Sequence, residues 1–286
     1  MKLAQLIQTL YYEPALITPD AHASIRQLLD DRLGDGRAGH QPSTLNHQLY
    51  KPATREPGRD FCGNEVEVEE MEIRDGIAYI PIGGALGQKL SPFDRGDGAV
   101  DILDVMQELD QAEDTSKCRG IILDMDSPGG MVSGTPELAD RIALVEKPIY
   151  AFSRGMIASA AYWIASACDG IFTTRSAQVG SIGVYLPVLD VSGYYEQRGV
   201  KVELIKAGKF KGDGFPGTKL SDDGRAGLQE RVNYIYSMFT AHVRSSRGAH
   251  IADETMQGQV FMGQEALRLG LVDALVTDIS DVASLI

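Results

Sequence analysis

Short apolar runs that end in tight turns, each followed by a segment with helical spacing of apolar residues, constrain the fold of this chain most strongly. The clearest run, Gly120-Ile-Ile-Leu-Asp-Met-Asp126, leads directly into Ser-Pro-Gly-Gly130, and similar runs occur at 76–82 and 148–152. Such runs are typical of buried strands. Helices are expected over 100–113, 135–145 and 158–167. A strand followed by a helix, repeated along the chain, requires crossover connections, so the sequence predicts an α/β fold with mainly parallel strands.

The two ends of the chain differ in character. Further strands are expected at 170–174 and 202–206. Ser221 is expected to cap a long helix with apolar residues at helical spacing. The N-terminal part instead suggests two short helices, at 3–11 and 19–32, and then a tract rich in Gly, Pro, Arg and Asn. Such a tract is typical of a linker. The sequence therefore predicts an N-terminal extension and linker over residues 1–65 and one folded domain over residues 66–286.

Charge and cysteine content exclude several classes of function. A formal net charge of -13 disfavours nucleic acid as a partner, because phosphate backbones are bound by clustered Lys and Arg. Cys62, Cys118 and Cys168 lie far apart without a Cys-x-x-Cys pair, so they are interpreted as reduced core thiols, and neither a metal nor another cofactor is expected. The N-terminus lacks the pattern of a signal peptide, and the weakly polar stretch 157–168 is too short to span a bilayer. A cytoplasmic protein without a membrane span is expected.

The positions of the histidines limit the possible catalytic groups. All five lie outside residues 48–241, at His22, His40, His47, His242 and His250. A Ser-His-Asp triad in the regular part of the chain would therefore need a histidine from one of the flanks. A cysteine nucleophile at Cys168 is disfavoured for the same reason, since it has no obvious base nearby in the sequence.

Two further motifs are interpreted as structural. Asp124 and Asp126 share one face at the end of a strand and would suit a metal, but capping of the following turn is the more ordinary role of such a carboxylate. The string Gly212-Asp-Gly-Phe-Pro-Gly217 matches a dinucleotide-binding pattern. However, the next helix is expected to begin only near Ser221, so these glycines cannot present its first amides to a pyrophosphate.

Two segments carry a stronger suggestion of chemistry. Gly129 and Gly130 follow a strand end, where their N–H groups can approach a reacting carbonyl without interference from a side chain. Ser159, between Ala158 and Ala160, stands at the start of an apolar helix, where free amides and the helix dipole favour a developing oxyanion. On these residues alone, an ordinary helix cap is the more usual role of such a serine.

The motifs, taken in order, resemble those of the signal peptide peptidase A family of serine proteases, and within it the phage capsid (prohead) proteases. The resemblance covers roughly residues 70 to 280. It is carried by Gly120–Val132, Ala158–Ala160, Val179–Val184, Leu204–Gly214 and Phe261–Asp273. It implies a ClpP/crotonase-like fold of repeated β-β-α units with mainly parallel sheets.

The resemblance also implies the roles of particular residues. It makes Ser159 the nucleophile, Lys211 the general base, with Lys209 as the alternative, and Ser181 the residue that orients the lysine. Backbone amides for the oxyanion and the substrate are expected at Gly129, Gly130 and Ala160. A lysine acts as a base only when neutral, and only about 0.04% of ordinary lysine side chains are neutral at pH 7. Lys211 is therefore expected to be buried.

The implied activity is endopeptidase cleavage by a Ser-Lys dyad on a polypeptide substrate. Processing of phage scaffold or capsid proteins in host cytoplasm or in proheads is expected, with portal, capsid or scaffold proteins as partners and a homo-oligomer as the assembly. The scaffold would then be a separate protein or be encoded in an overlapping frame. The alternatives are a housekeeping peptidase, acyl-CoA chemistry of the crotonase type, and an inactive capsid-associated scaffold.

Overall fold

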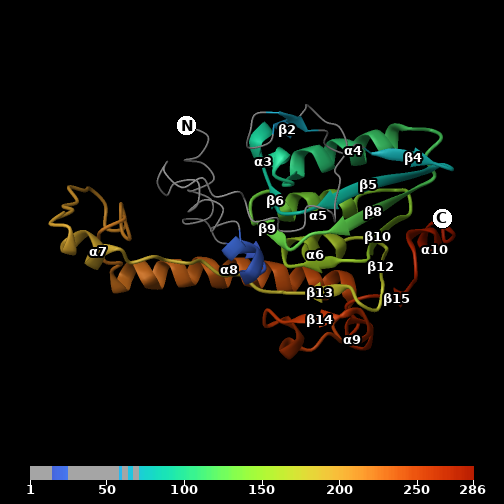
Figure 1. The fold of residues 1–286 in the computed structure, drawn as a ribbon. Helices are drawn as coiled ribbons and strands as arrows, with labels where there is room; N and C mark the ends of the chain where they lie inside the picture. Colours follow the sequence, from blue (N-terminus) through green and yellow to red (C-terminus); the bar gives the residue numbers. More distant parts are fainter. Residues whose placement is uncertain (1–14, 25–57, 60–63, 67–70) are drawn as a thin grey trace.

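A six-stranded sheet forms the centre of the computed structural model, which describes residues 15–24, 58–59, 64–66 and 71–286 (Figure 1). The strand order is β15-β12-β10-β8-β5-β4, and every neighbouring pair is parallel except β4 with β5. The strands are β4 (Glu72–Arg74), β5 (Ile77–Gly83), β8 (Gly120–Asp126), β10 (Ile149–Ser153), β12 (Gly170–Thr173) and β15 (Ala274–Leu275). The prediction of an α/β fold with mainly parallel strands is confirmed.

The central strands are apolar on both faces because helices cover both sides of the sheet. Successive residues Ile121, Ile122 and Leu123 of β8 are fully buried, as expected for parallel sheets. One face packs against the main core with α4, α5 and α6, and Ile122 on the other face packs with Val282 of α10. These helices are α4 (Ile102–Asp114), α5 (Thr135–Ala143), α6 (Ala160–Ala165) and α10 (Ile279–Ala283).

Short strands beyond the ends of the central strands build two smaller sheets. The four-stranded sheet has the order β1-β9-β6-β7 and the three-stranded sheet the order β11-β13-β14. Their members are β1 (Ala15–Ile17), β6 (Leu86–Gly87), β7 (Val100–Asp101), β9 (Gly129–Met131), β11 (Met156–Ala158), β13 (Gln178–Gly180) and β14 (Val260–Met262). The chain thus passes from β8 through β9 to α5, and from β10 through β11 to α6. This is the expected β-β-α repeat.

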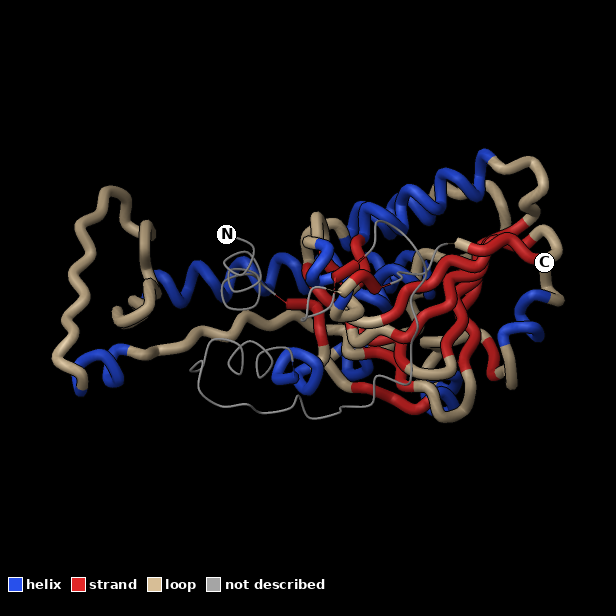
Figure 2. The backbone as a smooth tube through the Cα atoms, turned by 45° about the horizontal axis from the view of Figure 1, so that its top comes forward, coloured by secondary structure: helices blue, strands red, loops and turns tan. Residues whose placement is uncertain are grey.

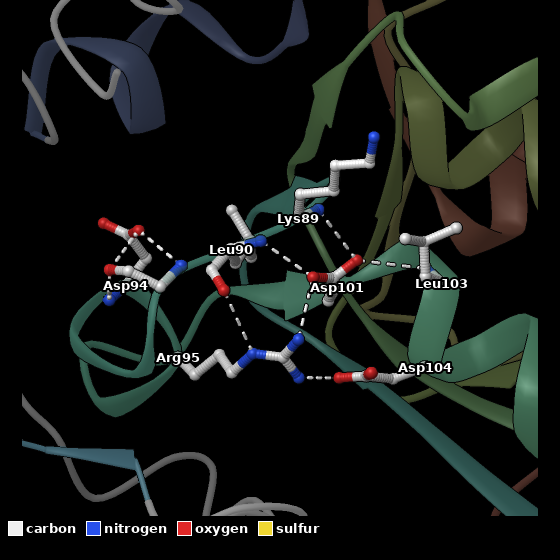
Figure 3. Close-up of polar contacts among 8 residues, drawn as sticks. Lys89, Leu90, Asp94, Arg95, Asp101, Leu103 and Asp104 are labelled. Carbon is white, nitrogen blue, oxygen red and sulfur yellow. Dashed lines mark hydrogen bonds and ion pairs between the residues drawn. The ribbon is translucent and has the colours of Figure 1, made fainter. Parts of the chain in front are cut away.

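Asp101 fixes the start of α4 and the loop that precedes it (Figure 3). Its side chain is 2% exposed. It accepts hydrogen bonds from the amides of Leu103 at 3.0 Å and Leu90 at 2.7 Å, and it pairs with Arg95 at 2.8 Å. Arg95 also pairs with Asp104 in the first turn of α4. One buried carboxylate therefore caps a helix and anchors the loop after β6, because its two oxygens accept several donors at once.

An arm extends from the body between β13 and the long helix α8 (Figures 1 and 2). It carries α7 (Ser192–Gln197) and returns along α8 (Asp222–Arg247). Ser221 caps α8 as predicted and accepts a hydrogen bond from the Gly224 amide at 3.0 Å. α8 is held against the body where Phe239 stacks on Trp163 of α6, with ring centroids 4.7 Å apart.

The strand predicted at 202–206 is wrong, because this part of the arm contains no regular secondary structure. Its apolar residues include Ile205, which is 99% exposed. Alternating apolar residues form a strand only where a neighbouring strand accepts their backbone hydrogen bonds. The arm of this single chain has no such neighbour among the described residues.

The remaining elements differ from the predictions mainly at their ends. The helix expected over 158–167 is shorter because residues 156–158 form β11, and the helix expected over 100–113 begins after β7. Residues 19–24 are helical, as expected for the start of 19–32, while 25–32 and the predicted helix 3–11 lie outside the described residues. The other elements are β2 (Gly58–Arg59), β3 (Glu65–Val66), α3 (Pro92–Gly96), the 3-10 helix Asp253–Met256 and α9 (Gly263–Arg268).

Candidate active site

Ser159 occupies the turn between β11 and α6, with a backbone conformation that non-glycine residues rarely adopt. Its φ is 55° and its ψ is -118°, and the residue is 1% exposed. Its amide donates to the Gly180 carbonyl at 2.8 Å, and its carbonyl accepts from the Trp163 amide at 3.0 Å. Strained residues at the turn from a strand to a helix are held in place by their surroundings and are frequent at catalytic sites. This geometry favours the nucleophile over the simple helix cap, and Ser159 makes no capping hydrogen bond.

Gly129 lies directly against Ser159. A Cβ on Gly129 would stand 2.8 Å from the Ser159 Cβ, and φ at Gly129 is +101°. Both the close approach and the left-handed backbone require glycine here. The structure therefore brings together two of the predicted residues, Gly129 and Ser159, from β9 and the β11–α6 turn.

The backbone amides predicted to bind the oxyanion differ in their hydrogen-bond partners in this structure. The Gly129 amide donates to Ser127 Oγ at 3.2 Å, and Ser127 Oγ donates to the Gly84 carbonyl at 2.6 Å. Gly130 lies in β9 between β1 and β6. Ala160 is the first residue of α6, and the first amides of a helix have no partner within it. The sequence reasoning missed Ser127, although its place in the Ser-Pro-Gly-Gly motif signalled a role beside these glycines.

Ser181 directly follows β13, the strand that pairs with β11 just before Ser159. Ala158 of β11 pairs with Gly180 of β13 in parallel register, so Ser159 and Ser181 each follow a paired residue. Ser181 has a φ of 52°, is 6% exposed, and donates its amide to the Gln259 carbonyl at 2.6 Å. The structure thus groups Ser181 with Ser159 and Gly129.

Lys211 is not brought to Ser159. It lies on the arm between α7 and α8, away from α6 (Figures 1 and 2), and its side chain is exposed. The expected burial of Lys211 is therefore absent in this single chain. The alternative, Lys209, is also on the arm and forms an ion pair with Asp223 at 2.7 Å.

Other candidate groups have structural surroundings. Asp126 accepts a hydrogen bond from the Met156 amide at 3.0 Å, and burial raises the pKa of both Asp126 and Asp124. Burial also raises the pKa of the Cys168 thiol, which makes it a poor nucleophile. No cluster of three metal-ligating side chains occurs among the described residues. Cys62 lies outside them.

The glycine-rich string at 212–217 lies on the arm before α8, and its Asp213 binds the Ser221 amide at 3.1 Å. It therefore shapes the start of the helix. A membrane-spanning helix is also absent from the part of the chain that the structure describes, since none is both long and apolar enough.

Two family models match this chain. The model of peptidase family S49 matches residues 143–285, half of the chain, and includes Ser159, Ser181 and Lys211. This chain belongs to peptidase family S49. The model named Clp protease matches residues 99–179, which cover β9, β11 and α6 of the S49 chain. The ClpP/crotonase-like fold is thereby confirmed.

The S49 chain is also similar to two phage proteins. It is 35% identical over 73% of its length to the capsid assembly protease C of Escherichia phage lambda, covering 48% of that protein. It is 30% identical over 96% of its length to the head-tail preconnector protein GP5 of Enterobacteria phage P21, covering 55% of it. The chain therefore spans about half the length of the curated relatives it matches.

Among solved structures, the chain matches a ClpP1 mutant from Listeria monocytogenes, at 15% identity and a TM-score of 0.47. The match covers 71% of the S49 chain and 92% of that structure.

Proposed function

We propose that this chain is a serine endopeptidase in which Ser159 attacks the scissile carbonyl of a polypeptide. The observation that carries the proposal is the strained, buried Ser159 beside Gly129 at the start of α6. A nucleophile in such a turn faces the acyl group while the free amides behind it stabilise the oxyanion. Ala160 is proposed to supply such an amide, and Gly129 and Gly130 are proposed to bind the oxyanion or the backbone of the substrate.

The proposed base is Lys211, which would take the proton from Ser159 Oγ and then give it to the leaving amine. Water would then hydrolyse the acyl-enzyme, and the lysine would accept and return the proton again. Ser181, which lies beside Ser159, would orient the lysine amine. This mechanism needs neither a metal nor a nucleotide.

Because the arm holds Lys211 away from α6, we propose that Lys211 of one copy serves Ser159 of a second copy. Large apolar side chains are exposed along the arm, which a second copy would cover. They are Val188, Leu189, Tyr194, Val200, Ile205, Phe210 and Phe215. Contact with that copy would also bury Lys211, which the chemistry requires and the single chain lacks.

The proposed substrates are scaffold or capsid proteins of a phage head, cleaved during maturation in host cytoplasm or in the prohead. Support comes from the capsid and preconnector relatives in phages lambda and P21. A housekeeping peptidase acting on unrelated unfolded chains is the alternative role, and comparison of purified coat and scaffold proteins with denatured casein as substrates separates the two.

A fluorophosphonate probe tests the nucleophile. We expect wild type to be labelled on Ser159, Ser159→Ala to be unlabelled and inactive, and Ser181→Ala to keep some labelling. The loss of cleavage in Ser159→Ala should be at least about 10³-fold. Equal cleavage by wild type and Ser159→Ala would refute the mechanism, and an unlabelled, inactive wild type would favour a scaffold protein.

Mixing two inactive variants tests the exchange of lysine between copies. If Lys211 acts across an interface, equal amounts of Ser159→Ala and Lys211→Ala should recover activity, because mixed assemblies contain sites with both groups intact. If the arm instead folds back onto its own body, the mixture should remain as inactive as its components.

A further inference from the structure

The strand β1 fills a slot that is one strand wide beside the candidate nucleophile. On one side it pairs antiparallel with β9, with Leu16 opposite Gly130 and Ile17 opposite Gly129. On the other side the Ala15 amide donates to the Tyr185 carbonyl at 2.8 Å, and the Tyr185 amide donates back at 3.3 Å. Without β1, two unpaired backbone edges would face each other across the slot.

The slot passes directly over Ser159. The Leu16 carbonyl oxygen and the Ser159 Cβ lie 2.1 and 2.8 Å from the point that a Cβ on Gly129 would occupy. Ser159 and the backbone of β1 therefore meet at the same glycine. An extended peptide that replaced β1 would run past the nucleophile.

β1 uses a backbone group that the substrate would need. The Thr18 amide donates to the Pro128 carbonyl at 3.0 Å. Hydrogen-bonded and non-hydrogen-bonded residue pairs alternate along antiparallel strands. Thr18 and Pro128 form a bonded pair, so Ile17 and Gly129 form a non-bonded pair. Leu16 and Gly130 are then the next bonded pair, which exchanges both N–H···O bonds. The Gly130 amide, proposed to bind substrate, is thus bonded to the Leu16 carbonyl.

Side chains anchor β1 in the slot. Leu16 is fully buried in the main core and Ile17 is 5% exposed. The helical residues that follow add a contact between His22 Nδ1 and the Tyr185 hydroxyl at 2.6 Å. Addition of a strand to an exposed edge gives affinity through the main chain and selectivity through pockets for alternate side chains. The pocket filled by Leu16 is apolar.

We propose that β1 is the chain's own occupant of the peptide-binding slot and competes there with substrate. Polypeptide enters only when β1 leaves, and it binds as an extended strand antiparallel to β9 with an apolar residue in the Leu16 pocket. The inference rests on the proposed peptidase function. It assigns residues 15–18 an inhibitory role that their place in an N-terminal extension did not suggest.

A reversible disulfide between β1 and β9 tests the proposal in the full chain. Ala15 and Met131 face each other as a non-bonded pair, whose Cα separation of about 4.5 Å suits a disulfide. In the variant Ala15→Cys with Met131→Cys, oxidation should hold β1 in the slot. We expect cleavage of denatured casein to fall at least about 10-fold on oxidation and to recover with dithiothreitol. The single variant Ala15→Cys, treated identically, should be unaffected.

Equal cleavage by the oxidised and reduced forms, with the disulfide verified by mass spectrometry, would overturn the proposal and leave the peptidase function intact. A binding measurement tests the slot assignment even if the chain turns out not to be a peptidase. A fluorescent peptide with the sequence of residues 13–20 should bind the reduced form and not the oxidised form, whether or not either cleaves casein. The same peptide carrying Leu16→Asp should bind at least about 10-fold more weakly, because its pocket is apolar. Equal binding of both peptides, or binding unchanged by oxidation, would contradict the slot assignment.

Discussion

The body of the molecule and its arm hold the two halves of the proposed dyad in opposite ways. In the body, Ser159 is 1% exposed and its backbone is bonded to Gly180 and Trp163. On the arm, Lys211 is exposed, and the nearby Ile205 is 99% exposed. A nucleophile needs an exact position relative to fixed amides, which a packed core supplies. The base needs burial, which the arm alone does not supply.

This difference teaches that one chain completes the turn of the proposed nucleophile but leaves the proposed Ser-Lys pair incomplete. The arm presents apolar side chains and the lysine together, so the surface that would assemble copies also carries the proposed base. Activity is then expected to depend on the assembly of copies.

The largest effect is expected from the two arm lysines. Lys211→Ala should lower kcat by about 10³-fold or more, because loss of a general base removes a proton acceptor from the transition state. Lys209→Ala should change it less than about 3-fold, since its exposed ion pair with Asp223 contributes little. Steady-state kinetics on a peptide substrate measures both. The reverse order would move the base to Lys209.

The next largest difference is expected between substitutions of apolar side chains in the body and in the arm. Trp163→Ala should lower the free energy of unfolding by about 3–5 kcal/mol, because it removes a buried ring stacked on Phe239. Ile205→Ser should change it by less than about 0.5 kcal/mol in dilute single chains. Chemical denaturation monitored by the circular dichroism of the backbone, which does not depend on Trp163, measures both free energies of unfolding. Ile205→Ser should instead shift the assembly equilibrium in sedimentation toward single chains, and an unchanged equilibrium would remove this residue from the interface.

Two glycines with positive φ separate backbone strain from crowding. Gly129→Ala should lower the free energy of unfolding by about 3 kcal/mol and nearly abolish cleavage, because its Cβ would meet Leu16 and Ser159. Gly199→Ala on the arm, where nothing lies within 4 Å, should lower it by only about 1 kcal/mol from φ strain. Equal losses in the two variants would show that strain alone decides.

The smallest effects are expected from two carboxylates with opposite pKa shifts. Burial raises the pKa of Asp126, whereas hydrogen bonds from Ser221 lower that of Asp213. In wild type, the Asp126 contribution therefore makes stability fall as the pH rises from 3.8 to the raised folded value. The Asp213 contribution is present above pH 3.8 and is lost as the pH falls toward the lowered folded value.

Thermal melts between pH 3 and 7 on Asp126→Asn and Asp213→Asn measure the two contributions. Asp126→Asn should gain relative to wild type as the pH rises through its window, and Asp213→Asn should gain relative to wild type as the pH falls through its own. Parallel pH profiles for both variants and wild type would contradict both assignments.

Much of the central sheet could be predicted because its strands are long and apolar. The run 120–126 became β8 without change, and Ser221 capped α8 as expected. β7, β11 and β13, of two or three residues each, could not be predicted, because so few residues show no periodicity. Residues 202–206 include three apolar residues, as a strand would, yet pairing requires a neighbouring strand that the described part of this chain does not place there.

Sequence motifs predicted individual residues of the candidate site but not how these residues are arranged in space. Gly129, Ser159 and Ser181 were identified from motifs, and the parallel pairing of β11 with β13 places the two serines side by side. Tyr185 had no signal in the sequence, because its contribution to the slot is a backbone edge that any residue could provide. Its hydroxyl contact to His22 joins residues far apart in the chain.

The sequence by itself determined the α/β class and, through its motifs, the membership of the peptidase S49 family with its β-β-α repeat. It also singled out Ser159 as the proposed nucleophile, since all of these depend on local patterns and motifs. Only the tertiary structure decided that Ser159 sits in a strained turn against Gly129, that β1 occupies the slot above it, and that Lys211 points away on an arm. The reason is physical: a local pattern reports which face of a segment is apolar, while the partner of a backbone edge or of an exposed arm is chosen by the packing of distant segments.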